Sequence, residues 1–216
     1  MTKIYDLTPA TYNLYEDVLA EASVVGTFVK GPACSRCKES QWERISPLVI
    51  EWEEGSDVIA DFTWPCGLDE RVVTQKVKDC LDNHGFIGVS LGPVEMFQNP
   101  KLKKPARVGA RNKKRIWLPY EGPRLWDLST TSWCNLDVQK SKRTLIKECD
   151  ICHRKQYDVL DGAAPLVVDP KTWDGSEFFK IRELGDLVFV LEKVKKVFEK
   201  AGFANVKIEE RGRIGP

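Results

Sequence analysis

The sequence lacks any long apolar run. No stretch of its 216 residues approaches the roughly 18 consecutive apolar residues that a membrane-spanning helix needs. The first residues, MTKIYDLTPATYNLYEDVL, contain no continuous apolar segment and carry Asp6, Glu16 and Asp17, which argues against a signal or transit peptide. We therefore expect a protein that has no membrane partner and works in the cytoplasm.

An excess of one charge is also lacking. The 33 Lys and Arg residues nearly balance the 32 Asp and Glu residues, which leaves a formal net charge of +1. A balance of this kind gives no overall attraction to nucleic acid or to an anionic membrane, so any charge argument must be local. With 42% hydrophobic and 30% charged residues, the composition is that of an ordinary globular chain with one domain or two small ones.

The motifs of common enzymes are missing as well. The sequence has no Gly-rich phosphate-binding loop and no H-E-x-x-H pattern. A catalytic thiol would have to recruit His84 or His153, the only two histidines. Among the isolated thiols Cys66, Cys80 and Cys134, buried small apolar groups are the simpler interpretation. We expect a protein that is not an enzyme and has no catalytic residues.

The sequence does contain an internal similarity. Residues 61–91 align with residues 178–208 without a gap, and this alignment brings together Gly85-Phe86 and Gly202-Phe203. Upstream, SPLVIEW resembles APLVVDP, and CSRC resembles CDIC. These matches predict an α+β fold built as a two-copy pseudo-repeat, in which each copy has a zinc knuckle, strands, an amphipathic helix and a closing strand.

Each copy is expected to contain one amphipathic helix. Apolar residues recur at intervals of three and four, which is typical of a helix that buries one face. Gly85 and Gly202 stand where a left-handed helix C-cap is expected, with Phe86 and Phe203 placed to pack on the last turn. The residues assigned to the two stripes are Val73, Val77, Cys80 and Leu81 in the first copy and Leu187, Val190, Leu191, Val194, Val197 and Phe198 in the second.

The repeat divides the chain into four segments, which we expect to form one compact domain. They are an N-terminal segment without a counterpart (1–24), the first repeat (25–97), a basic and aromatic insertion (98–143) and the second repeat (144–216).

The two C-x-x-C pairs, Cys34 with Cys37 and Cys149 with Cys152, head the two copies. One pair supplies half of a tetrahedral site, and two pairs complete a four-cysteine site with metal–sulfur distances of roughly 2.3 Å. Two knuckles, each preceded by a short strand, would form a zinc-ribbon-like arrangement. We predict one structural zinc ion per chain, without an open coordination position. The alternatives are a redox-active C-x-x-C and two reduced pairs without metal.

The insertion carries the candidate partner surface. Its first part, residues 101–115, contains eight cations and no acidic residue, and its second part is rich in Trp and Tyr. Aromatic and Arg side chains are frequent anchors of protein interfaces. The same cations would suit phosphates, so nucleic-acid binding through 101–115 is the alternative. The candidate partner-binding residues are Lys113, Lys114, Arg115, Trp117, Arg124 and Trp126.

The paired C-x-x-C knuckles, together with DGAAPLVVDPKTWDGSEFFKIRELGDLVFVLEKVKKVFEKAGFANVKIEE after the second, resemble the double-CXXCG motif proteins. This bacterial group was first noted in myxobacteria and is associated with immunity to contact-delivered Sit toxins. The resemblance covers residues 25–210 and implies an immunity protein that binds and neutralises a cognate protein toxin. It also implies that the four knuckle cysteines are metal ligands.

The sequence departs from the family motif at one position in each knuckle. The Gly after the second Cys, which allows a turn with positive φ, is replaced by Lys38 in the first knuckle and by His153 in the second. The departure raises the question of whether His153 replaces a thiol as ligand.

Overall fold

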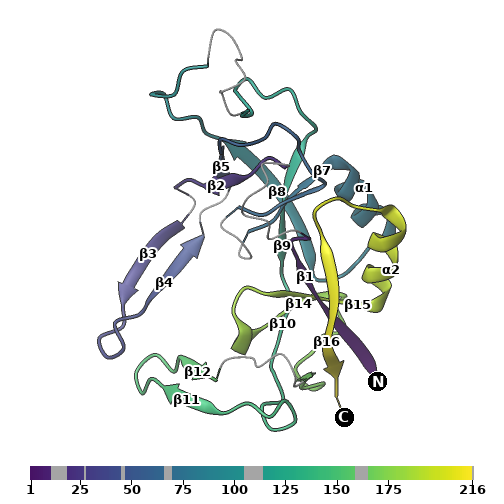
Figure 1. Ribbon diagram of the computed structural model, residues 1–216. Coiled ribbons are helices and arrows are strands. Elements are labelled where there is room, and N and C mark those ends of the chain that lie inside the picture. Colours follow the sequence, from purple (N-terminus) through teal and green to yellow (C-terminus); the bar gives the residue numbers. More distant parts are fainter. Residues whose placement is uncertain are drawn as a thin grey trace.

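A computed structural model describes residues 1–10, 19–26, 28–44, 47–65, 70–104, 114–158 and 165–215, with only the backbone described at 41–44. Within these ranges the chain folds into two six-stranded sheets, two separate β-hairpins, two α-helices and a short 3-10 helix, η1 (Arg182–Leu184) (Figure 1). The predicted α+β class is therefore confirmed. No helix in the described ranges is long and apolar enough to cross a membrane.

The first sheet is built largely from the N-terminal half of the chain. In sheet order its strands are β2 (Ala22–Val24), β5 (Leu48–Trp52), β8 (Val89–Met96), β9 (Leu125–Thr130), β7 (Val72–Thr74) and β6 (Phe62–Thr63).

The second sheet is built largely from the C-terminal half, but the first strand of the chain lies near its centre. In sheet order its strands are β10 (Trp133–Cys134), β14 (Phe178–Ile181), β15 (Val188–Leu191), β1 (Thr2–Thr8), β16 (Lys207–Ile214) and β13 (Leu166–Val168).

Five strands of each sheet have the same connectivity. A parallel pair, β5 with β8 or β13 with β16, is followed in both sheets by three antiparallel pairings. The third strand of this series is distant in sequence from its neighbours in both cases. Strand β9 lies between β8 and β7, and β1 lies between β16 and β15. Segments 1–24 and 98–143 thus each supply an inner strand to a sheet.

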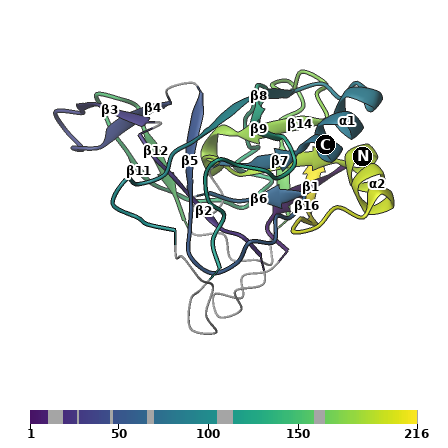
Figure 2. The same cartoon turned by 90° about the horizontal axis from the view of Figure 1, so that it is seen from above.

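Each C-x-x-C pair lies in a hairpin of its own. The first hairpin pairs β3 (Phe28–Ala33) with β4 (Ser40–Arg44), and the second pairs β11 (Leu145–Glu148) with β12 (Lys155–Tyr157). Both hairpins lie on the side of the molecule opposite the two helices (Figures 1 and 2).

The helices are shorter than the sequence pattern predicts. Helix α1 spans Gln75–His84 and α2 spans Glu192–Ala201. The predicted stripes were wrong at their N-terminal ends, where Val73 lies in β7, Val190 and Leu191 lie in β15, and Leu187 precedes β15. Runs of β-branched and aromatic residues favour extended backbone, and their alternating side chains reach both faces of a sheet.

The helix C-caps are as predicted. Gly85 and Gly202 adopt left-handed conformations with φ of 57° and 61°, and their N–H groups bond to carbonyls of the preceding turn. Phe86 and Phe203 are buried in the core next to these caps. A side chain at either glycine would be strained by the positive φ, which explains why both helices end there.

One central core is filled from both sheets and both helices. Phe62 of the first sheet lies 5.8 Å from Phe198 of α2, measured between ring centroids, and Phe178 of the second sheet lies 5.9 Å from Phe86 after α1. These separations fall within the range of favourable aromatic pairs. Two further clusters, one per sheet, cover the outer faces.

Hydrogen bonds cross between the two sheet–helix units in a reciprocal way. The backbone N–H of Ala204, after α2, donates to the carboxylate of Asp61 at 2.9 Å. The backbone N–H of Ile87, after α1, donates to the carboxylate of Glu177 at 2.8 Å. Asp61 directly precedes β6, and Glu177 directly precedes β14. Each carboxylate therefore accepts a hydrogen bond from the segment that follows the helix of the other unit.

Two lysines follow the same reciprocal pattern. Lys76 forms an ion pair with Asp61 and its Nζ lies 5.1 Å from the ring centroid of Phe203. Lys193 forms an ion pair with Glu177 and lies 5.2 Å from the centroid of Phe86.

The pH dependence of stability tests the Glu177 contact. Burial alone would raise the pKa of Glu177, but the Ile87 N–H and the Lys193 ammonium together lower it below its ordinary value of 4.5. A depressed carboxyl pKa stabilises the fold above the unfolded-state pKa, and this stabilisation is lost as pH falls through the folded-state value. For Glu177→Gln we expect urea unfolding at neutral pH to show a loss of about 1–2 kcal/mol.

The deficit of Glu177→Gln should shrink as the pH is lowered below 4.5, the ordinary value for Glu. Glu199→Gln is the matched control, because Glu199 also pairs with a lysine, Lys195 at 3.7 Å, but on the exposed surface of α2. A deficit for Glu177→Gln that is equal at all pH values would contradict the proposed role of the carboxylate.

Candidate metal centre

The hairpins place the four knuckle cysteines at their turns. Cys34 directly follows β3, and Cys149 directly follows β11. The N–H of Cys34 donates to the carbonyl of Glu39 at 2.8 Å, and the N–H of Cys149 donates to that of Arg154 at 3.0 Å. The two turns are thus closed in the same way, with the second Cys of each pair inside the loop.

The knuckle turn keeps its positive-φ conformation in both hairpins, although the glycine of the family motif is replaced. Lys38 and His153 adopt positive φ angles of 65° and 55°. Their N–H groups donate to the carbonyls of Cys34 at 3.0 Å and Cys149 at 2.9 Å. A non-glycine residue in this conformation is uncommon, so its occurrence at both matched positions indicates that the turn geometry is required there.

Backbone N–H groups in the turns point at the first sulfur of each pair. The N–H groups of Cys37 and then Arg36 lower the pKa of the Cys34 thiol. Those of Cys152 and then Ile151 lower the pKa of Cys149 to about 6. Hydrogen bonds to a thiolate favour the charged form, which is the form that binds metal.

The four sulfur atoms form one cluster. The Sγ atoms of Cys34 and Cys149 are 3.7 Å apart, as are those of Cys37 and Cys152. All four lie within 4.8 Å of one another, and the group consists of these cysteines without His153. Tetrahedral ligands at a metal–sulfur distance of about 2.3 Å would be separated by about 3.8 Å, so the cluster fits a metal site with four cysteine ligands.

The cluster is not a pair of disulfides, because S–S bonds are only about 2.05 Å long. Six cysteines in the described part of the chain are free thiols. The pKa of Cys152 rises to about 12: the N–H of Arg154 lowers it, but the adjoining sulfurs of Cys149, Cys34 and Cys37 and burial outweigh that effect. Four thiolates this close together repel one another, and a bound cation would remove the repulsion.

Ion pairs flank the cluster and join the same two hairpins. Arg36 lies 3.6 Å from Asp150, and Arg154 lies 3.1 Å from Glu39. Both pairs are well exposed, so they contribute little to stability by themselves. These four residues were not predicted from the sequence, although each stands within two positions of a knuckle cysteine.

The remaining thiols do not join this cluster. Cys134 is buried, and its pKa is raised to about 12 by burial. Cys80 packs partly against the central core, and burial raises its pKa too. Its sulfur lies 3.9 Å from Nδ1 of His84, whose ring stacks on Phe86. Cys66 lies outside the described residues.

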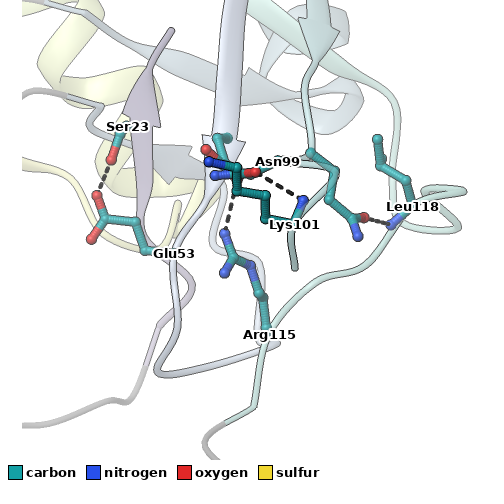
Figure 3. Close-up of polar contacts among 8 residues, drawn as sticks. Ser23, Glu53, Asn99, Lys101, Arg115 and Leu118 are labelled. Atoms are coloured by element: carbon teal, nitrogen blue, oxygen red, sulfur yellow. Dashed lines mark hydrogen bonds and ion pairs between the residues drawn. The ribbon is translucent and has the colours of Figure 1, made fainter. Parts of the chain in front are cut away.

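The structure separates the predicted partner-binding residues into two groups, while Lys113 lies outside the described residues. Lys114 is paired with Asp57 at 3.1 Å. Arg115 is paired with Glu51 at 3.2 Å, and its guanidinium lies 5.8 Å from the ring centroid of Trp117. The dashed line from the guanidinium of Arg115 in Figure 3 marks this ion pair. These two cations are therefore engaged within the chain.

The second group consists of Arg124 and Trp126. The guanidinium carbon of Arg124 lies 4.2 Å from the ring centroid of Trp126, and Nζ of Lys78 lies 4.9 Å from the same centroid. The indole N–H of Trp126 donates to the side chain of Gln75 at 2.8 Å. Lys78 was not among the predicted partner-binding residues, although it aligns with Lys195 in the repeat.

No protein-family model matches the sequence, and no curated protein matches it. The similarity to the double-CXXCG proteins therefore stays a prediction that rests on the motifs.

Removal of one sulfur tests the metal site. For Cys149→Ser we expect the metal content measured by elemental analysis to fall to near zero and the melting temperature to fall by roughly 10 °C, because a three-sulfur site binds metal less tightly. Cys80→Ser is the control, because Cys80 is a partly buried thiol outside the cluster. Wild-type protein without metal, combined with an unchanged melting temperature in Cys149→Ser, would contradict the site.

Proposed function

We propose that Cys34, Cys37, Cys149 and Cys152 hold one structural zinc ion. The donor set is all sulfur, and the two sulfur–sulfur contacts of 3.7 Å are close to the separation expected in a tetrahedral site. Thiolate ligands in this geometry are typical of zinc and of iron–sulfur proteins, and zinc is the usual metal of structural sites with four cysteine ligands. Four protein ligands leave no coordination position for water or substrate. The site would therefore join the two hairpins rather than catalyse a reaction.

A redox role is less consistent with this geometry. In a redox C-x-x-C the two thiols of one pair exchange a disulfide, and the second pair would have no part in the chemistry. The 3.7 Å contacts instead join Cys34 to Cys149 and Cys37 to Cys152, across the two pairs.

We also propose that the chain is a fused duplicate whose two units have exchanged a strand. The shared sheet connectivity, the reciprocal hydrogen bonds and the matched knuckles support this interpretation. It pairs β1 with β9, so the N-terminal segment gains a counterpart: IYDLT in β1 corresponds to LWDLS in β9. Each unit would contribute its first strand to the other unit's sheet.

A circular permutant tests the duplication. Thr2 pairs with Ile214, so a short Gly-Ser linker can join the two ends of the chain, which lie side by side in Figure 1. In a chain opened between Lys104 and Pro105, the first strand among the described residues is β9, as the first strand of the native chain is β1. We expect it to fold with the wild-type metal content and circular dichroism spectrum. A permutant that stays unfolded in the presence of zinc would contradict exchanged, equivalent units.

For the protein as a whole, we propose a cytoplasmic immunity protein that binds and neutralises a cognate toxin. The observation that carries a binding role is the closed sulfur cluster, which offers structure and no catalytic position. The similarity of the paired knuckles to the double-CXXCG proteins supports a toxin as the partner. Free thiols at all six described cysteines are consistent with a reducing compartment.

Nucleic-acid binding through residues 101–115 remains the alternative. It would use the cations of that segment, of which Lys114 and Arg115 are paired with Asp57 and Glu51. Cations that are already paired with carboxylates displace few counterions from a nucleic acid, so these two pairs weaken the case for phosphate binding by Lys114 and Arg115.

Co-expression with the product of the adjacent gene tests the immunity proposal. We expect the two proteins to purify as a stable complex and the host cells to survive a toxin that kills them alone. Cys80→Ser should protect as well as wild type, because it leaves the sulfur cluster intact. The immunity proposal would be contradicted if the host cells survived although the two proteins form no complex. It would also be contradicted if the product of the adjacent gene neither bound this protein nor killed the cells.

A further inference from the structure

The side chain of Arg124 lies on the first sheet in a position that has a structural counterpart. Trp126 of β9 pairs with Val73 of β7, as Tyr5 of β1 pairs with Val190 of β15. Arg124 therefore corresponds to Lys3, since each lies two residues before the aromatic residue. The lysine contact is matched too: Lys78 lies over Trp126 at 4.9 Å and Lys195 lies over Tyr5 at 4.7 Å.

The two positions differ in their acidic partner. On the second sheet, Glu210 of β16 stands opposite Tyr5 and forms an ion pair with Lys3 at 2.7 Å. On the first sheet, the residue opposite Trp126 is Pro93 of β8, which has no carboxylate. Within the described ranges, the ion pairs of the structure include none for Arg124, whose contact is the Trp126 ring.

A small cavity lies beside Arg124, Trp126 and Pro93. It has a volume of about 220 Å³ and is lined by Pro93, Val94, Met96, Tyr120, Arg124, Leu125 and Trp126. Sites for drug-sized ligands measure roughly 300–1,000 Å³, so this cavity suits one side chain better than a whole small molecule. Its wall is mostly apolar, and Arg124, which is exposed to solvent, is the charged residue of the lining.

We infer that this cavity and Arg124 form the docking point for an acidic segment of a protein partner, in which an Asp or Glu pairs with Arg124 and a neighbouring apolar side chain enters the cavity. This inference rests on the proposed binding function and specifies the partner's chemistry. The partner's carboxylate takes the place that Glu210 has on the second sheet. Stacking on Trp126 holds the planar guanidinium in position, which lowers the entropy lost when a carboxylate binds in bidentate geometry.

A nucleic acid fits this surface less well. Base stacking needs an open aromatic face, but Trp126 is contacted by Arg124 and Lys78, and Tyr120 stacks on Trp52 with centroids 6.3 Å apart. The guanidinium of Arg115 lies 5.8 Å from the ring centroid of Trp117. Trp117, Tyr120 and Trp126 thus already have partners within the chain, whereas an acidic peptide needs only the guanidinium and the apolar cavity.

A peptide probe tests the inference without knowledge of the partner. The probe is a capped hexapeptide of alternating Glu and Leu, titrated into the zinc-loaded, full-length protein while the indole N–H resonance of Trp126 is followed by NMR. We expect saturable shifts of this resonance. Arg124→Glu should weaken binding by about tenfold or more, and Arg124→Lys should have an intermediate effect because it keeps the charge and loses the planar fork.

Lys3→Glu is the matched control, because it reverses the charge at the equivalent position of the other sheet. It should change the affinity by less than about twofold, since rim charges far from the contact act only through screened electrostatics. A second peptide with Gln in place of Glu should bind at least about tenfold more weakly. Equal binding of the two peptides, or equal effects of Arg124→Glu and Lys3→Glu, would overturn the inference.

An oligonucleotide of deoxythymidine is the competing probe. If it shifts the Trp126 resonance at lower concentration than the Glu peptide, Arg124 is a phosphate ligand and the inference fails. The adjacent gene product separates the inference from the proposed function. If that product binds with an affinity that Arg124→Glu does not change, only the docking point is wrong. If the Glu peptide binds as expected and the product does not, the docking point stands and the immunity proposal fails.

Discussion

The rest of the structure depends on the shared aromatic core between the two sheets. Phe198 of α2 packs against Phe62 of the first sheet and against Phe178 of the second, at centroid distances of 5.8 and 6.2 Å. Neither sheet can bury its inner face without side chains that the other sheet and its helix supply. The two sheets therefore share one hydrophobic core, although five strands of each have the same connectivity. The reciprocal contacts of Asp61 and Glu177 fix how the units meet around this core.

Much of the local structure could be predicted from the sequence. Gly85 and Gly202 mark the helix ends because only a left-handed cap explains glycine followed by an apolar residue at both sites. The helix starts could not be placed, since Val73 and Val190 satisfy a helical spacing and a strand alternation equally well. Strand partners were harder still. The correspondence of β1 and β9 is visible as IYDLT and LWDLS, but a five-residue match becomes meaningful only when both strands are seen at the same place in a sheet.

For the candidate site, too, some features could be predicted from the sequence and others could not. Cysteine spacing predicted the sulfur cluster, because few residue types bind metal and their pairing leaves few combinations. Spacing could not show that Lys38 and His153 would keep the glycine conformation, which the surrounding turn imposes. Nor could it separate Arg115, paired with Glu51, from Arg124, stacked on Trp126. Charge along a sequence does not reveal whether a carboxylate from a distant strand lies within reach.

The inner position of β1 has a consequence for how the chain is made. Asp6 of β1 pairs with Arg211 of β16, which lies 205 residues later. At synthesis rates of roughly 5–20 residues per second, the first strand waits about 10–40 s on the ribosome before its partner exists. During that interval the apolar side chains of Ile4, Tyr5 and Leu7, which are buried in the folded protein, cannot yet pack in their native sheet. The second sheet therefore cannot be completed before β16 has been synthesised, and until then β1 is a candidate binding segment for a chaperone that acts on nascent chains.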